Sequence, residues 1–179
     1  MTKDEIDYIV KAFALASKRA QDAGFDGVEI HAAHTYLINQ FLSPYYNRRE
    51  DEYGGDLENR MRFLLEIYSE TRKLVGSEFP ILVKLTATEF FDGGLTFNET
   101  RVVCKKLEEI GVDAIIVSGN VHGKANELVG QTFDGYTLQE EGYFHEYGHV
   151  ISQDVSIPVI TVGGLSDIDA IEKIAENTG

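Results

Sequence analysis

The chain has 179 residues, of which 43% are hydrophobic and 26% charged, so it has the length and composition of one folded domain with a sizeable core. Its 30 Asp and Glu residues outnumber its 16 Lys and Arg residues, and the net charge of −14 argues against nucleic acid or an anionic membrane as a partner. The single cysteine, Cys104, excludes an internal disulfide and a zinc site made of cysteines.

Hydrophobic periodicity predicts helices and strands that alternate along the chain. In chain order the predicted elements are a helix at 3–23 closed by Gly24, a strand at 26–31, a loop at 32–55, a helix at 57–75, a strand at 80–86, a helix at 97–110, a strand at 114–118, a loop at 119–138, a helix at 140–153, a strand at 157–162 and a helix at 166–176 with Ser166 as its N-cap. No segment is apolar enough to span a bilayer and the charged N-terminus does not resemble a signal peptide, so we expect a cytoplasmic protein without a membrane partner.

Four short apolar strands, each followed by a helix, predict a parallel sheet of the α/β class. Right-handed connections allow either a doubly wound sheet or a TIM (β/α)8 barrel. No Gly-x-Gly-x-x-Gly follows a strand, and the long loops follow strands rather than helices, which favours the barrel. A complete barrel usually takes ~250 residues. We therefore expect residues 1–179 to form a partial (half) barrel of four parallel strands with helices, and to be part of a larger enzyme.

The most informative segment follows the first predicted strand, where His31, His34 and Tyr36 lie within six residues. Enzymes of the α/β class place their chemistry at strand ends, because the strand is rigid and the loop beyond it is free to vary. A single histidine here would most often be structural. Two histidines and a tyrosine together favour a functional site.

Strand alternation places Glu29 and His31 on one face of the first strand, and Leu82, Lys84 and Thr86 on one face of the second. A lysine in an apolar strand needs a partner. Lys84 either forms a structural pair with Glu29 or holds a bound anionic group.

A metal-dependent TIM-barrel hydrolase stays open as an alternative, with Glu29, His31 and His34 as ligands. The other predicted strands carry no His or Asp that would complete such a site.

Several segments resemble the Old Yellow Enzyme family of FMN-dependent NAD(P)H:flavin oxidoreductases and enoate reductases. The resemblance rests on residues 23–34 (AGFDGVEIHAAH), 36–44 (YLINQFLSP), 80–85 (PILVKL), 93–96 (GGLT) and 157–164 (IPVITVGG), and on Asn47, Arg49, Asp51, Tyr53, Gly54, Gly55, Asn59 and Arg60. It covers nearly the whole chain, and it matches the four strands to the fourth to seventh strands of the family's barrel. The signature from Asn47 to Arg60 would brace the long loop.

The resemblance implies a role for each candidate residue. His31 and His34 would bind the carbonyl oxygen of the substrate and stabilise the charge that develops on it. Tyr36 would donate the proton to the α-carbon. Lys84 stands where most of the family carries Arg, and its charge would stabilise the N1/O2 edge of reduced FMN. Gly163 and Gly164 would contribute to the FMN phosphate site.

The expected protein is therefore an FMN-dependent NAD(P)H oxidoreductase that reduces activated, α,β-unsaturated alkenes. FMN and NAD(P)H are its expected cofactors, and a small molecule is its expected substrate. A half barrel leaves sheet edges and an apolar face uncovered, so we also expect a homo-oligomer. A half barrel that self-associates without catalysis stays open as a further alternative.

Overall fold

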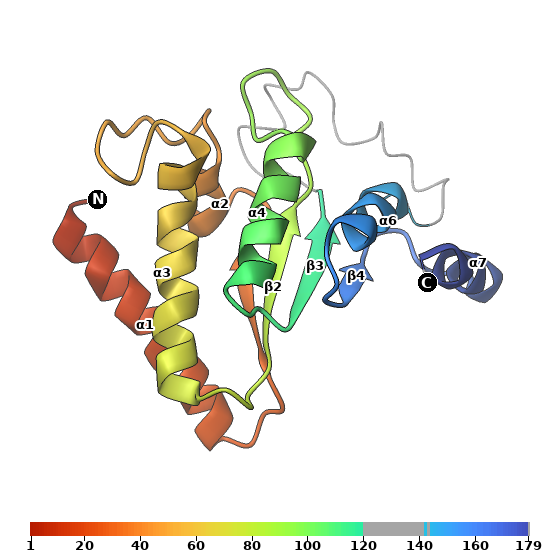
Figure 1. Cartoon of the computed structure of the whole chain (residues 1–179), viewed down its shortest axis with the longest axis horizontal. Helices are drawn as coiled ribbons and strands as arrows, with labels where there is room; N and C mark the ends of the chain where they lie inside the picture. Colours follow the sequence, from red (N-terminus) through yellow and green to blue (C-terminus); the bar gives the residue numbers. More distant parts are fainter. Residues whose placement is uncertain (120–141, 143, 179) are drawn as a thin grey trace.

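Four strands form one parallel sheet whose spatial order, β1-β2-β3-β4, is the same as their order along the chain. The computed structural model describes residues 1–119, 142 and 144–178 (Figure 1). The strands are β1 (Val28–Ala32), β2 (Ile81–Thr86), β3 (Ala114–Ser118) and β4 (Val159–Thr161). Every neighbouring pair is parallel, which confirms the predicted α/β class with four parallel strands.

Helices alternate with these strands much as the periodicity predicts. They are α1 (Lys3–Asp22), α3 (Leu57–Val75), α4 (Phe97–Glu109), α6 (His145–Asp154) and α7 (Ile168–Thr178). The strand predicted at 157–162 is shorter than expected, because its ladder with β3 spans only the positions from Ile115 to Val117. Most of the loop predicted at 119–138, and positions 140, 141 and 143 of the helix predicted at 140–153, lie outside the described residues.

One part of the predicted loop at 32–55 is wrong, because it contains a short helix, α2 (Leu37–Leu42). Six residues are too few for a helical period to stand out in a sequence. Packing stabilises this helix instead. Ile38, Phe41 and Leu42 are buried in the core, where the Phe41 ring lies 4.4 Å from the ring of Phe63 on α3.

Side-chain oxygens cap the N-termini of α1, α3, α4 and α7. Thr2 and Thr96 form capping boxes with the glutamates three residues later, and Asp56 caps α3. The predicted N-cap of the last helix, Ser166, is wrong by one residue. The carboxylate of Asp167 accepts the backbone N–H groups of Asp169 at 2.8 Å and Ala170 at 3.1 Å. A carboxylate satisfies these donors and also complements the positive end of the helix.

The two faces of the sheet differ in what covers them. Ile81, Val83 and Leu85 of β2 are at most 1% exposed and belong to the hydrophobic core formed with α3 and α4 (Figure 1). The alternate residues Leu82 and Lys84 are half-buried and line the opposite face. This alternation agrees with the predicted orientation of Lys84 and leaves one face of the sheet for polar side chains.

The long connection after α2 is tied down by side chains of its own signature. Arg60 on α3 is 4% exposed, and its guanidinium donates to the carbonyls of Leu42 and Gly55 and pairs with Glu99 on α4. The Asn47 amide donates to the carbonyls of Phe41 and Tyr53, each at 2.7 Å. These contacts fit the bracing role expected of this segment.

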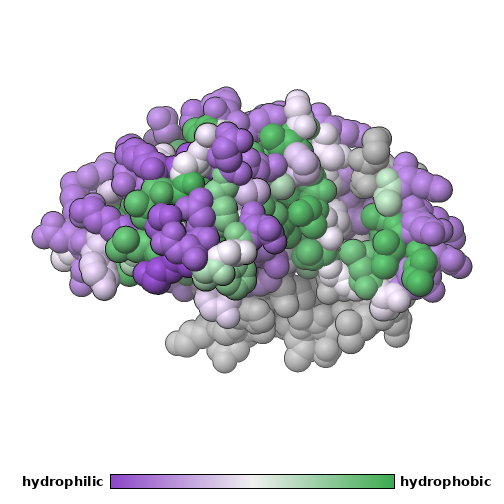
Figure 2. Space-filling view, turned by 90° about the horizontal axis from the view of Figure 1, so that it is seen from below, coloured by the Kyte–Doolittle hydropathy of each residue, from purple (hydrophilic) through white to green (hydrophobic). Residues whose placement is uncertain are grey.

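The face of the molecule shown in Figure 2 is mostly hydrophilic, with hydrophobic groups exposed between the hydrophilic ones. Near the C-terminal end of the described chain, Ile160, Ile168 and Ile171 are exposed by 41%, 72% and 41%. Within the described residues, no helix combines the length and the apolar character needed to cross a membrane.

A buried hydroxyl on α3 gives a test of how α3 packs in the core. Thr71 is fully buried, and within the described residues its Oγ1 has no hydrogen-bond partner. Thr100 on α4 is equally buried, but its Oγ1 donates to the carbonyl of Thr86 at 3.1 Å. We expect Thr71→Val to raise the free energy of unfolding by about 1 kcal/mol, and Thr100→Val to lower it by about as much. Urea denaturation with unchanged m values measures both. A larger loss in Thr71→Val than in Thr100→Val would show that the Thr71 hydroxyl is satisfied.

Candidate active site

The structure brings the three predicted site residues together at the carboxyl end of β1. The ring centroids of His31 and His34 are 5.1 Å apart, with the planes at 77°. The centroids of His31 and Tyr36 are also 5.1 Å apart, with the planes at 55°. Tyr36 is 57% exposed, so its hydroxyl can be reached by a small molecule. Two imidazoles and a phenol can together bind an oxygen and move a proton.

The backbone between these rings has an uncommon conformation. His34 and Thr35 both have φ of +58°, in the left-handed region that favours glycine. The His34 N–H donates to Thr86 Oγ1 at 2.9 Å, and the Thr35 N–H donates to Asn39 Oδ1 at 2.7 Å. These contacts hold the backbone of the turn against Thr86 at the end of β2 and Asn39 on α2.

Ser118 is a site residue that sequence reasoning did not assign. Its Oγ lies 2.6 Å from Nε2 of His34, and the shared proton belongs to either group depending on the tautomer of the ring. Ser118 ends β3 and pairs in register with Thr86 of β2, whose side chain holds the His34 backbone. The signal was present in the sequence, because a serine at the end of an apolar strand lies at the same edge as the histidines. The strand register that brings Ser118 to His34 could not be read from the sequence.

Lys84 lies beside His31 on the open face of the sheet, since the two residues are register partners. Its Nζ is 3.9 Å from Glu29 Oε1, and His31 Nδ1 is 3.7 Å from the same oxygen. The predicted Lys84–Glu29 pair is therefore present, as a long ion pair on partly exposed side chains. At 3.9 Å the ammonium is beyond hydrogen-bond distance of Glu29, so its donors can also turn toward an anionic group.

Gly163 and Gly164 follow β4 at the same edge of the sheet. Their φ values are +106° and +65°, which a residue with a Cβ rarely adopts. The N-terminus of α7 begins a few residues later, capped by Asp167. The Asp167 carboxylate already takes the N–H groups of Asp169 and Ala170 in the first turn of α7. Backbone without a Cβ lets a phosphate approach closely, so it is the loop at Gly163 and Gly164 that fits the group implied by the resemblance.

A buried carboxyl group, that of Glu89, lies next to Asn39, which bonds the turn after β1. Glu89 is fully buried, and its Oε2 accepts the Ser43 hydroxyl at 2.5 Å and the Leu95 N–H at 2.7 Å. Burial raises the pKa of the Glu89 carboxyl above its usual range. Its Oε1 lies 3.5 Å from the Asn39 amide nitrogen. Neither Glu89 nor Asn39 was expected from the sequence, because a polar residue in a loop gives no sign of being buried.

The remaining histidines lie elsewhere. His145 Nδ1 is 2.9 Å from the Gly142 carbonyl, and His149 Nε2 is 3.0 Å from the Gln153 amide. His122 lies outside the described residues. Among the residues that the structure describes, no three His, Cys, Asp or Glu side chains are grouped so that they could hold a metal ion. The described residues therefore give no support to the hydrolase alternative.

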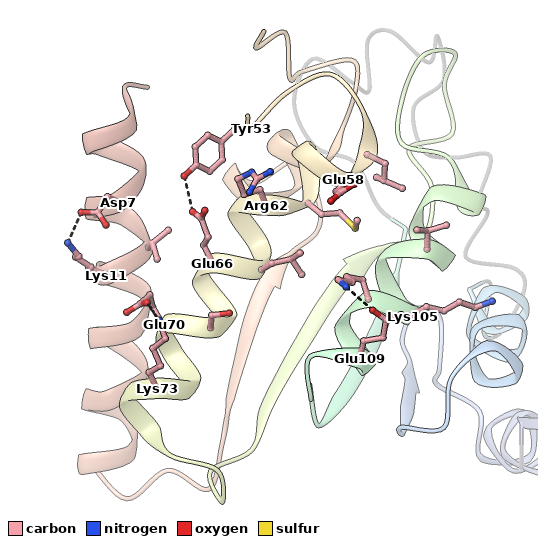
Figure 3. Close-up of a pocket in the computed structure, with 17 residues that line it drawn as sticks. Asp7, Lys11, Tyr53, Glu58, Arg62, Glu66, Glu70, Lys73, Lys105 and Glu109 are labelled. Carbon is pink, nitrogen blue, oxygen red and sulfur yellow. Dashed lines mark hydrogen bonds and ion pairs between the residues drawn. The ribbon is translucent and has the colours of Figure 1, made fainter. Parts of the chain in front are cut away.

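A groove of about 1050 Å³ lies on the helix side of the molecule, between α1, α3 and α4 (Figure 3). Many of its charged side chains are engaged with each other, such as Lys11 with Asp7 at 2.6 Å and Lys106 with Glu109 at 2.8 Å. None of the candidate site residues lines it. The candidate site at the strand ends is therefore separate from this groove.

Removing the Ser118 hydroxyl tests whether it fixes the His34 ring. We expect Ser118→Ala to change the ratio of Nδ1-protonated to Nε2-protonated His34, because a hydrogen bond to one nitrogen selects the tautomer. Long-range ¹H–¹⁵N correlation spectra of the imidazoles measure this ratio. Ser17→Ala, which removes a hydroxyl bonded to the Phe13 carbonyl on α1, is the matched control. If the His34 signals match in both variants, Ser118 does not select the tautomer.

Curated proteins resemble this chain over nearly its whole length. It is 41% identical to an NADH oxidase of Thermoanaerobacter brockii over 97% of this chain and 26% of that protein. It is 40% identical to an NADPH dehydrogenase of Clostridium acetobutylicum over 99% of this chain and 49% of that protein. It is 36% identical to a cinnamate reductase of Clostridium sporogenes over 93% of this chain and 27% of that protein. The chain thus spans between about a quarter and a half of the length of these relatives.

Solved structures share its fold. A 2-naphthoyl-CoA reductase in complex with 2-naphthoyl-CoA matches with a TM-score of 0.88 and 31% identity, over 98% of this chain and 26% of that one. Morphinone reductase in complex with tetrahydroNAD matches with a TM-score of 0.70 and 30% identity, over 100% of this chain and 44% of that one. The sequence model of the NADH:flavin oxidoreductase / NADH oxidase family matches residues 1–179. The chain belongs to this family, which confirms the resemblance to Old Yellow Enzyme and, for the family, FMN and NAD(P)H as cofactors.

Proposed function

We propose that the chain forms part of the TIM-barrel domain of an FMN-dependent NAD(P)H oxidoreductase that reduces activated alkenes, with residues 1–179 as one partial domain. The observation that carries this proposal is the cluster of His31, His34 and Tyr36 at the strand end beside Lys84, with the His31 ring centroid 5.1 Å from each of the other two. Family membership supports it. So does the similarity to an enzyme named for cinnamate, which is an α,β-unsaturated carboxylate.

The residues at the strand ends fit FMN. Gly163 and Gly164 have backbone at positive φ and carry no Cβ, so a phosphate could approach this loop closely. Lys84 places an ammonium on the open face of the sheet, where it would meet the anionic edge of the ring system. Lysine provides a point charge without the planar fork of arginine, so it fixes the charge but not the orientation of its partner. Bound FMN would supply the hydride for the alkene.

His31 and His34 bind the substrate oxygen in this proposal. Imidazole N–H groups polarise a carbonyl and stabilise the negative charge that grows on its oxygen. Ser118 already holds Nε2 of His34 at 2.6 Å. A substrate oxygen would therefore meet Nδ1 of His34 or displace the Ser118 hydroxyl.

Tyr36 supplies the proton to the α-carbon. A phenol is a weak acid, but the carbon that it protonates is far more basic. The ring lies next to His31 and is 57% exposed, so its hydroxyl can face a substrate that His31 holds by its oxygen. A small-molecule substrate and a cytoplasmic location complete the proposal.

We further propose that the chain self-associates. In the described sheet β1 and β4 each have one unpaired edge, and Ile160, Ile168 and Ile171 are exposed on β4 and α7. Exposed edges and apolar side chains favour association. We expect a dimer by light scattering and a shift toward monomer in Ile168→Asp. Val102→Asp, a 50% exposed position on α4, should leave the dimer intact. A monomer across a wide concentration range would contradict self-association.

Replacing Tyr36 by Phe tests the proposed reaction. We expect the FMN-loaded Tyr36→Phe variant to be reduced by NAD(P)H at nearly the wild-type rate, because the phenol takes no part in that step. Alkene reduction should slow by ~10²–10⁴-fold, the usual cost of losing a general acid. Stopped-flow measurement of the two half-reactions separates the effects. Tyr8→Phe, at a 70% exposed position on α1, is the control. Unchanged reduction of a poorly activated alkene would show that the proton has another source.

A further inference from the structure

We propose that Asn39, Thr86 and Glu89 are positioning residues that hold the turn at His34 and Thr35 in its left-handed conformation. By holding this turn they set how the rings of His31, His34 and Tyr36 face one another. The consequence for catalysis rests on the proposed function, whereas the consequence for the turn does not. We call these three residues the buried support.

The turn needs such a support because its backbone is costly. His34 and Thr35 follow each other at φ of +58°, and Thr35 is β-branched, the type of residue that this region accommodates least. Such conformations persist only where the surrounding structure holds them in place. Because the turn joins His31 to Tyr36, a change in its φ values would change how the histidine and tyrosine rings lie relative to one another.

Two side chains hold the turn by its backbone. Thr86 Oγ1 accepts the His34 N–H at 2.9 Å, and Asn39 Oδ1 accepts the Thr35 N–H at 2.7 Å. The Thr86 hydroxyl donates in turn to Asn39 Oδ1 at 3.2 Å. Thr86 ends β2 and Asn39 lies in α2, and both are fully buried. The acceptors thus stand on rigid elements where water cannot replace them.

Glu89 supports the orientation of the Asn39 amide, together with the two donors on Asn39 Oδ1. Glu89 Oε1 lies 3.5 Å from Asn39 Nδ2, which leaves Oδ1 as the atom that faces the turn. A flipped amide would present N–H groups to the Thr35 N–H and lose the acceptor. Glu89 is itself held by the Ser43 hydroxyl at 2.5 Å and the Leu95 N–H at 2.7 Å.

Amide exchange in the 179-residue chain tests the support without flavin. In Asn39→Leu we expect the His34 amide to exchange at least about tenfold faster, because the turn opens when Thr35 loses its acceptor. Thr86→Val, which keeps the shape of the buried side chain, should expose the same amide directly. Asn47→Leu removes an amide that bonds the Phe41 and Tyr53 carbonyls but does not touch the turn. This variant controls for general destabilisation, and it should leave the exchange rate of the His34 amide unchanged.

A glycine at position 35 separates positioning from packing. Glycine adopts positive φ without steric cost, so a turn that contains it needs less support. We expect Thr35→Gly to return the His34 exchange rate of Asn39→Leu to within about threefold of the wild type. Faster exchange in Asn39→Leu and Thr86→Val with recovery in Thr35→Gly/Asn39→Leu supports the proposal. Unchanged exchange, or no recovery, overturns it.

Kinetics of the FMN-loaded protein carry the inference to the reaction. If the rings are positioned by the turn, Asn39→Leu should lower kcat for alkene reduction at least about tenfold, leave reduction by NAD(P)H unchanged, and recover with Thr35→Gly. A kcat that does not follow the exchange rates overturns the catalytic role of the support. Failure of the loaded wild type to reduce any alkene refutes the proposed function instead, and the exchange results then still decide the role of the support in the turn.

Discussion

The backbone hydrogen bonds that pair β1 with β2, and β2 with β3, decide which residues of the candidate site face one another across the strands. They place His31 opposite Lys84 and Thr86 opposite Ser118. Because side chains alternate along a strand, a slip of one residue would turn Lys84 into the helix-packed core and expose Val83 in its place. Burial of the hydrophobic face of β2 therefore determines which residues lie on its polar face. Burying Ile81, Val83 and Leu85 at no more than 1% exposure leaves Lys84 no alternative face.

The polar side of this edge is built in two layers that differ in exposure. The layer that can meet a ligand, His31, Lys84 and Tyr36, is partly open to solvent. The layer behind it, Asn39, Thr86 and Glu89, is fully buried. A buried hydrogen bond is harder for water to replace than an exposed one, so the second layer can hold the first in place. Rigidity is thus concentrated behind the residues that need access.

The sequence predicted the parts of this architecture that depend on local pattern. Alternating helices and strands follow from hydrophobic period, and the opposed faces of β2 follow from the alternation around Lys84. The cluster of His31, His34 and Tyr36 was found because its members are close in sequence. Ser118, Thr86 and Glu89 reach the same site from distant positions, and their contacts depend on a register that no short pattern reveals. The helix α2 was missed because packing, rather than a helical period, stabilises its six residues. The cap at Asp167 was missed because Ser166 and Asp167 are adjacent and both can cap a helix.

The spatial order of the strands has a consequence for how the molecule is made. In the sheet each strand neighbours the one that precedes it in the chain, so no strand must wait for a later segment before it can pair. As the chain emerges from the ribosome, β2 can pair with β1 and then β3 with β2. Each helix can pack on the strands that have already formed. Each pairing of two strands closes a long loop, which slows the pairing. Until the next strand pairs, the edge of the last strand in the sheet stays exposed. The growing end of the sheet is therefore the place where chaperones or a neighbouring chain would find this protein most vulnerable during synthesis.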